Sequence, residues 1–369
     1  MRSTRIVATT VAFSALLVSA AGQAQAPAAT AAAPQSGPGV QAPRDSRYAS
    51  YLAANCKNAP APAAAPPPRA AAPAPEHRDY KVTAIPGVIA DGAAWKTIWT
   101  GTGNNADGPI ATDDGGMLFA QNTDSKVLKL DANGKASYPY SDTNTGGALA
   151  RSKNGALYVL QRGLPQEIWQ LEPKRQKVVS SINGEPLDCA GGLLNDMTAD
   201  SKGGLYFTKG GVYYADAKGV VTHYGTLAGG NGIILSPDEK TLYVTGRLPS
   251  TPTEPAPAGA APAARPGGLV AYDVQPDGSL ANERQFALAG GDGSAVDDQG
   301  RIYSTGGNGV QVIDKSGKHL GEIPSPLPLI TVAFSGPDKK TLFGVANNQQ
   351  HVEIFTLPML TSGYKGRAK

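Results

Sequence analysis

Four short segments of the sequence begin with an Asp or an Asn whose side-chain oxygens are candidates for binding a cation. The segments are Asp107-Gly108-Pro109, Asn195-Asp196-Met197, Asn231-Gly232-Ile233 and Asp292-Gly293-Ser294. Carboxylate and amide oxygens suit a hard divalent ion, so one Ca²⁺ is the expected cofactor, with Mn²⁺ and Mg²⁺ as alternatives. Zn²⁺ is a further alternative, although it more typically recruits His or Cys, and neither residue lies at these starts.

A purely structural interpretation of the same residues also exists. Asn, Asp and Gly are common at strand ends because their side chains form Asx turns with the backbone. Two further segments, Gly146-Gly147-Ala148 and Thr331-Val332-Ala333, occupy the same point of the repeat described next and begin with neither Asn nor Asp. Because four of the six segments share the oxygen-bearing residue, we favour the cation site.

A polar turn followed by an apolar, partly aromatic strand occurs six times along the chain. The copies are Asp113 to Phe119, Ser152 to Val159, Asp200 to Phe207, Ser236 to Val244, Asp297 to Tyr303 and Pro337 to Phe343. Their spacing of about 40 residues is the length of a four-stranded propeller blade. The sequence therefore predicts an all-β, six-bladed β-propeller. In that fold, the segment before each turn is the innermost strand, so the candidate oxygens would meet at one end of the central channel.

The first and last repeats predict how the ring closes. The last copy lacks a fourth strand after Phe355, whereas Trp95 to Thr100 precedes the first copy without a partner. We expect this N-terminal strand to complete the sixth blade, since closure removes exposed sheet edges. A Pro- and Ala-rich stretch over 249–268 is interpreted as a surface loop inserted in blade four.

The N-terminal 79 residues differ in composition from the propeller, which is expected over 80–369. Residues 1–24 have the basic start, apolar run and small-residue end of a signal peptide. The apolar run is about 15 residues, too short for a membrane span of about 20. Residues 25–79 are rich in Ala and Pro and are expected to be a disordered tether, within which Ser46 to Asn58 could form a short helix or dock on the body. The mature protein is therefore expected to be periplasmic or secreted.

Cysteine usage and charge limit the classes of partner. Cys56 and Cys189 are the only cysteines and could form a disulfide in an oxidising compartment or remain two thiols. The net charge is +3, with acidic and basic residues interspersed, so nothing indicates a nucleic-acid or membrane-surface partner. We expect a monomer that acts on a small molecule. The chain contains no G-x-S-x-G motif of a serine hydrolase.

The segment from Asn231 to Val244 (NGIILSPDEKTLYV) resembles the most characteristic segment of the senescence-marker-protein/gluconolactonase/luciferin-regenerating-enzyme family. The similarity covers the body from about Val88. It extends through Asn195-Asp196, Asp292-Gly293, Val296-Asp297, Gly309-Val310-Gln311-Val312 and Phe334-Ser335-Gly336-Pro337-Asp338.

This resemblance implies a metal-dependent hydrolase that opens lactones. Family members bind one divalent metal through a Glu, two Asn and an Asp, for which the matching positions are Asp107, Asn195, Asn231 and Asp292. The cation would polarise the lactone carbonyl, while Asp292 acts as general base or as nucleophile. Asn195 is the other residue expected to take part in catalysis, and Asp196 is expected to be a neighbour of the metal ligands that orients water or a ligand.

Several positions depart from the family pattern. Asp107 is one methylene shorter than the family's Glu, Leu193 lies where sugar-lactone members often carry Arg, Lys209 where they often have Asp, and Thr331 where they often have Asn. These departures keep two alternatives open. One is a non-catalytic binding or scaffold propeller, and the other is an aryl-ester or organophosphate hydrolase that uses the same site.

Overall fold

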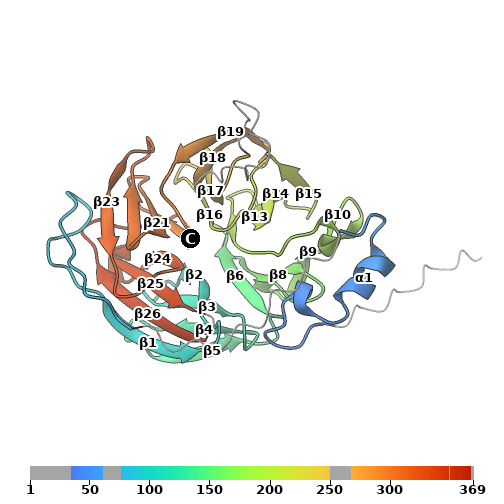
Figure 1. Cartoon of the computed structure of the whole chain (residues 1–369), viewed down its shortest axis with the longest axis horizontal. Helices are drawn as coiled ribbons and strands as arrows, with labels where there is room; N and C mark the ends of the chain where they lie inside the picture. The colour runs from blue at the N-terminus through green and yellow to red at the C-terminus, as the bar shows by residue number, and fades with distance from the viewer. Residues whose placement is uncertain (1–34, 61–75, 250–266, 349, 367–369) are drawn as a thin grey trace, which may run out of the picture. The chain divides into compact units, whose positions relative to one another are not determined.

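The computed structural model of this chain describes residues 35–60, 76–249, 267–348 and 350–366. Six antiparallel four-stranded sheets are arranged in a ring, which confirms the six-bladed propeller (Figure 1). The expected signal peptide and residues 250–266 of the expected loop lie outside the described residues. The loop's flanking strands are the second and third strands of blade four.

Blades one to five each use four consecutive strands, ordered from the channel outward. Blade one is β2 (Asp107–Ala111), β3 (Met117–Gln121), β4 (Lys126–Leu130) and β5 (Ala136–Tyr140). Blade two is β6 (Gly146–Arg151), β7 (Leu157–Gln161), β8 (Glu167–Glu172) and β9 (Gln176–Val179). Blade three is β12 (Met197–Ala199), β13 (Leu205–Lys209), β14 (Gly211–Ala215) and β15 (Val221–Tyr224). Blade four is β16 (Ile233–Leu235), β17 (Thr241–Gly246), β18 (Gly268–Val274) and β19 (Leu280–Ala287). Blade five is β20 (Ser294–Val296), β21 (Ile302–Gly306), β22 (Gly309–Ile313) and β23 (His319–Pro324).

Blade six joins the two ends of the propeller. It contains β24 (Thr331–Ser335), β25 (Thr341–Asn347) and β26 (His351–Pro358), and its outermost strand is β1 (Lys96–Thr102). Strand β1 pairs antiparallel with β26, from Lys96 opposite Thr356 to Thr102 opposite His351. The predicted closure of the ring by the N-terminal strand is therefore confirmed.

Asp residues in the predicted turns explain why the chain reverses there. Asp200 Oδ1 accepts hydrogen bonds from the backbone N–H groups of Lys202 (2.8 Å) and Gly204 (2.7 Å). Asp297 Oδ1 accepts equivalent bonds from the third and fifth residues of its own turn. Each carboxylate thus satisfies the backbone donors of a tight turn between the first and second strands of its blade.

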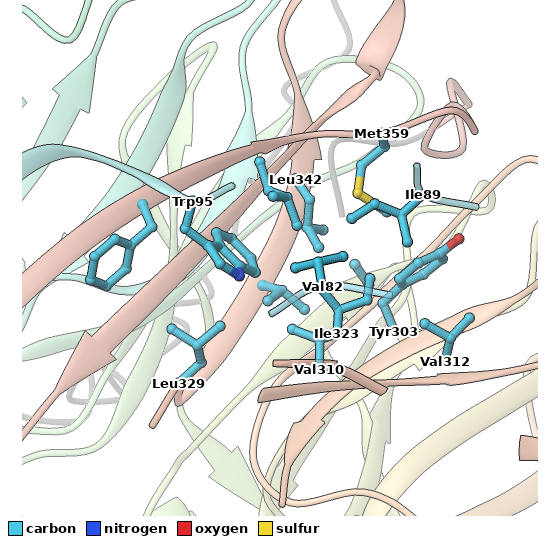
Figure 2. Packing of buried hydrophobic residues seen from close by; sticks show 14 of the residues in the cluster. Val82, Ile89, Trp95, Tyr303, Val310, Val312, Ile323, Leu329, Leu342 and Met359 are labelled. Carbon is cyan, nitrogen blue, oxygen red and sulfur yellow. The ribbon is translucent and has the colours of Figure 1, made fainter. Parts of the chain in front are cut away.

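The hydrophobic core lies between adjacent sheets. Figure 2 shows one such cluster, in which Trp95 lies beside Leu342 of blade six, and Val82 lies between Trp95 and Tyr303 of blade five. The indole Nε1 of Trp95 donates a hydrogen bond to the carbonyl of Pro324 (2.9 Å), so the ring is buried without leaving its polar atom unpaired. Residues before β1 therefore help to hold blades five and six together.

A short N-terminal segment packs on blade two. It contains the 3₁₀ helix η1 (Ala42–Arg44) and α1 (Tyr48–Asn55), and Ala42 and Leu52 form a buried cluster with Leu164. Cys56, which directly follows α1, forms a disulfide with Cys189 in the 3₁₀ helix η2 (Leu187–Ala190), with the Cα atoms 5.4 Å apart. The small hairpin β10 (Ser181–Ile182) and β11 (Glu185–Pro186) precedes η2, and η3 (Pro337–Lys339) lies in blade six.

None of the helices in the described ranges is long and apolar enough to cross a membrane.

Candidate functional site

The candidate oxygen ligands lie at the beginnings of innermost strands, as the repeat predicts. Asp107 is the first residue of β2, and Asn195 and Asp196 directly precede β12. Asn231 and Asp292 each lie two residues before the innermost strands of blades four and five. Neighbouring innermost strands contact each other around the ring, so these side chains come from four different blades to one end of the channel.

Asp196 joins blades three and four. Its Oδ1 accepts a hydrogen bond from the backbone N–H of Met197 (2.9 Å), and its Oδ2 accepts one from Ile233 (3.1 Å) at the start of β16. The side chain is buried, and bonds to backbone donors stabilise a carboxylate in such a place. Asp196 therefore holds the starts of two innermost strands in register. Its expected role in orienting water or a ligand stays a prediction.

Asp292 has the electrostatic surroundings of a potential general base. Burial raises its pKa to about 7, and the nearby charges of Asp107 and Asp196 act in the same direction. The Arg162 guanidinium and a hydrogen bond from Asn231 partly offset this rise in pKa. A carboxylate that titrates near neutrality can both accept and return a proton at physiological pH.

Asn231 provides the clearest test of whether this site suits a cation. Its side-chain Oδ1 is buried and has no hydrogen-bond partner within the described part of the chain. A buried amide oxygen without a donor is costly, and a cation is one group that would satisfy it. No group of three or more His, Cys, Asp or Glu residues that could hold a metal occurs among the described residues. The donor set therefore fits a hard divalent ion only if the amide oxygens of the Asn residues take part.

Arg162 was not among the residues expected in the site, yet it contacts two of them. Its Nη1 donates to Asp107 Oδ2 (3.2 Å), while Nη2 donates to the Oδ1 (2.9 Å) and the backbone carbonyl (2.6 Å) of Asn195. Its Nε donates to the carbonyl of Leu194 (3.0 Å). The Arg162 side chain is only 7% exposed. Four of the five guanidinium N–H donors are thus used by residues around the predicted site.

Lys209 is a second buried cation on the same side of the channel. Its ammonium group donates to the backbone carbonyls of Gly191 and Gly192. Burial lowers the pKa of Lys209 to about 8, and the charge of Asp188 opposes this shift. Burial raises the pKa of Asp188, whose carboxylate accepts hydrogen bonds from Gln166. Lys209 therefore fixes the loop that leads from η2 to Asn195.

A pocket of about 530 Å³ opens beside Asn231, away from Arg162 and Lys209. Six of its nine lining residues are glycines, and the complete set is Ala228, Gly229, Asn231, Gly246, Arg247, Gly267, Gly268, Gly290 and Gly291. Its wall is therefore mainly backbone, and among the described lining residues Arg247 supplies the only charged side chain. Such a surface suits a compact polar molecule better than an aromatic or long aliphatic one.

The sequence contains a signal for Arg162 that lies outside the pattern of oxygen-bearing residues. Blade two begins with Gly146-Gly147 and offers no carboxylate or amide there, while an Arg follows its second strand. A Cβ added to Gly147 would lie 2.0 Å from Arg162 Nε. The glycine therefore leaves the space that the guanidinium occupies.

Comparison with known proteins gives partial sequence matches to lactonases. The chain is 43% identical over 81 residues to lactonase drp35 of Staphylococcus saprophyticus, a match that covers 19% of this chain and 23% of the relative. It is 27% identical over 237 residues to lactonohydrolase oryL of Aspergillus oryzae, covering 53% of each protein. The chain thus spans about a quarter to about half of the length of the curated relatives it matches.

Comparisons of the fold and of the family pattern extend over most of the chain. A solved structure of a gluconolactonase from Xanthomonas campestris superposes with a TM-score of 0.63 at 22% identity, covering 79% of this chain and 99% of the other, which shows a shared fold. The family model described as the SMP-30/Gluconolactonase/LRE-like region matches residues 105–346, which include all the candidate oxygen ligands. This chain belongs to the SMP-30/gluconolactonase/LRE-like family.

Proposed function

We propose that this protein hydrolyses small lactones at the channel end where Asp107, Asn195, Asn231 and Asp292 meet. The observation that carries the proposal is the buried Asn231 Oδ1, which has no hydrogen-bond partner within the described residues and belongs to a side chain that is hydrogen-bonded to the Asp292 carboxylate. The partial matches to lactonases support the same chemistry. This end of the channel would hold one divalent cation, with Ca²⁺ the first choice.

Asp292 is the residue that would handle the proton. When bound, the cation would polarise the carbonyl of the lactone. As general base, the Asp292 carboxylate takes a proton from water while the water oxygen adds to the carbonyl carbon. The ring C–O bond then breaks, and the departing alkoxide oxygen receives the proton from Asp292. The products are a hydroxyl group and a carboxylate on one opened chain.

The alternative role of Asp292 as nucleophile leads to a different isotope pattern. In a single turnover in H₂¹⁸O, a general base delivers ¹⁸O directly into the product carboxylate. A nucleophilic Asp292 instead transfers one of its own ¹⁶O atoms to the first product, because water then cleaves the acyl-enzyme at the Asp292 carbonyl. Mass spectrometry of the first-turnover product distinguishes the two mechanisms.

The pocket beside Asn231 suggests which lactones are preferred. Its backbone wall and the Arg247 guanidinium favour a compact lactone with hydroxyl or acidic substituents over an aromatic one. We therefore propose that polar lactones have higher kcat/KM than aromatic or long-chain lactones of similar reactivity.

The test of the proposed function compares Asp292→Asn with wild type on a lactone panel. Acid release is measured with chelator and after addition of Ca²⁺, Mn²⁺, Mg²⁺ or Zn²⁺. We expect chelator-sensitive turnover and a loss of about a thousandfold in kcat for Asp292→Asn. Asp314→Asn, in the outer turn between β22 and β23, is the matched control and should retain the rate. No turnover of any lactone, or full activity of Asp292→Asn, would overturn the proposal and favour a binding propeller.

We also propose that the protein acts outside the cytoplasm. The leader-like residues 1–24 and the disulfide between Cys56 and Cys189 support this location, because disulfides persist in oxidising compartments. Fractionation of the producing cells, with N-terminal sequencing of the mature protein, tests it. Retention of Met1 in a cytoplasmic fraction would contradict it.

A further inference from the structure

Arg162 divides the oxygen ligands into two pairs. Its guanidinium is hydrogen-bonded to Asp107 Oδ2 and Asn195 Oδ1, two of the four oxygens expected to bind the cation. The other pair comes from Asn231, whose Oδ1 has no partner within the described residues, and from Asp292. The two pairs thus differ in whether the guanidinium is hydrogen-bonded to them.

We propose that Arg162 is a positioning residue that acts as a fixed cation within the site. It holds Asp107 and Asn195, so that the divalent ion binds mainly through Asn231 and Asp292. The inference rests on the proposed function in one respect, because it assumes that a divalent cation binds at this end of the channel. It goes further by assigning the four oxygens to two different cations.

The charge and burial of Arg162 make it an effective competitor for a metal ion. The guanidinium carries its positive charge on a planar group whose N–H donors lie in a fixed fork, and this geometry suits carboxylate and amide oxygens. The side chains of Arg162 and Asp107 are 7% and 18% exposed, so their attraction is weakly screened by water. A divalent ion bound to Asp107 and Asn195 would have to displace this guanidinium or lie against its positive charge.

The other blades show that Arg162 replaces a simpler arrangement. In blades three, four and five, a threonine near the end of the second strand donates its hydroxyl to a carbonyl before the next innermost strand. These bonds join Thr208 to Asn231 (2.6 Å), Thr245 to Asp292 (2.9 Å) and Thr305 to Ile330 (3.1 Å). In blade two, Arg162 makes the corresponding bonds to Leu194 and Asn195 and also extends to Asp107. A threonine hydroxyl would suffice to join blade two to blade three. The greater length and the positive charge of Arg162 therefore serve its contact with Asp107.

Gly147 provides an independent way to move the guanidinium. A Cβ at this position would lie 2.0 Å from Arg162 Nε and 2.4 Å from Cζ. Gly147 is not in the left-handed region, so an alanine adds no backbone strain there. Gly147→Ala therefore displaces the Arg162 side chain without changing its charge.

The experiment measures Mn²⁺ binding by calorimetry and by electron paramagnetic resonance, without substrate. The variants are Arg162→Gln, Arg162→Lys, Gly147→Ala, Asp107→Asn and the double variant Arg162→Gln/Asp107→Asn. Removing the guanidinium should tighten Mn²⁺ binding about tenfold or more, because a positive charge is lost and two oxygens are released. Arg162→Lys keeps the charge and should stay within about threefold of wild type.

Asp107 provides the decisive comparison in a double-mutant cycle. In the wild-type background, Asp107→Asn should change the Mn²⁺ affinity by less than about threefold, since the guanidinium already neutralises that carboxylate. In the Arg162→Gln background, the same substitution should weaken binding by about tenfold or more. If Asp107 were a primary ligand in wild type, Asp107→Asn alone would cause the larger loss.

Each outcome bears on the inference. Unchanged or weaker Mn²⁺ binding by folded Arg162→Gln would overturn it, even where wild type remains a chelator-sensitive lactonase and the proposed function stands. Mn²⁺ binding by Arg162→Gln but not by wild type would overturn the assignment of Asn231 and Asp292 as the ligands in wild type, and it would contradict the metal dependence proposed above. An absence of binding in every variant would overturn both. If Arg162→Gln does not fold, Gly147→Ala decides, and tighter Mn²⁺ binding by that variant would support the inference.

Discussion

Blades two and three differ from blades four and five at one equivalent position, at the end of the second strand of each blade. Arg162 and Lys209 occupy it in blades two and three, whereas Gly246 and Gly306 occupy it in blades four and five. On the first side, which we call the closed half, the two cations fill the space and bind backbone carbonyls. On the second side, the open half, the pocket of about 530 Å³ lies beside Asn231.

The comparison shows how one repeated blade can support two tasks. Side chains in the closed half hydrogen-bond to each other and to backbone carbonyls, and this fixes Asn195 and Asp107 in place. Glycines in the open half remove side chains and leave room for a ligand near Asn231. The scaffold is the same in both halves, so the division of tasks depends on a few residues at one end of the channel.

The largest expected effect concerns the covalent link that holds the closed half. The double variant Cys56→Ala/Cys189→Ala removes a bridge between residues 133 positions apart, which joins α1 to η2. We expect the free energy of unfolding in urea to fall by about 2–4 kcal/mol, because the unfolded chain is no longer constrained. Leu52→Ala, which weakens the packing of α1 but keeps the bridge, is the comparison variant. An unchanged unfolding midpoint in the double variant would show that the bridge contributes nothing to the closed half.

The second effect is a pH dependence caused by Lys209. Its pKa is lowered from 10.5 to about 8 by burial, so between these values the unfolded state binds more protons than the folded state. The contribution of Lys209 to the free energy of unfolding therefore rises as the pH rises from about 8 toward 10.5, by up to about 3 kcal/mol. Lys209→Met should lose that rise. Comparing urea unfolding of the two proteins from pH 7.5 to 9.5 cancels the contribution of the tyrosines, and parallel curves would contradict the prediction.

The third effect tests the open half. Gly267→Leu should place an isobutyl group in the pocket, since the nearest atoms to a Cβ there are 3.7 Å away or farther. We expect kcat/KM for lactones to fall about 30-fold with little change in the unfolding midpoint. Gly267→Ala is the matched control and should change kcat/KM by less than about threefold. Equal activity of the leucine variant would mean that lactones do not use this pocket.

The repeat in the sequence was sufficient to predict the ring, its six blades and its closure. The turns and alternating apolar residues recur at one spacing, and blades one to five each form from neighbouring segments. The unpaired N-terminal strand and the missing strand of the last repeat predict the closure of blade six. The Asp and Asn residues before the innermost strands were found for the same reason, since their position in the repeat fixes where they lie. Their function as ligands stays a prediction.

Arg162 and the pocket could not be predicted in the same way. The contact of Arg162 with Asp107 joins residues 55 positions apart and depends on the missing side chain of Gly147. The pocket is formed by glycines of blades four and five, which in the sequence are indistinguishable from glycines of ordinary turns. The Arg162 contacts and the pocket both depend on glycines that leave space for a group from another part of the chain. The repeat pattern does not show which glycines do so.

The smallest expected effect would sharpen the comparison by identifying what the open half recognises. Arg247 is exposed, its Cγ and Nε lie near Gly267, and it is the one charged residue among the described residues that line the pocket. Arg247→Gln should lower kcat/KM about tenfold for a lactone that bears a carboxylate, because a charge-assisted hydrogen bond is lost. The neutral primary amide of the same lactone should lose much less. Arg284→Gln, on β19 of the same blade and paired with Asp273 (2.8 Å), provides the control. An equal loss for both lactones would mean that Arg247 shapes the pocket without recognising charge.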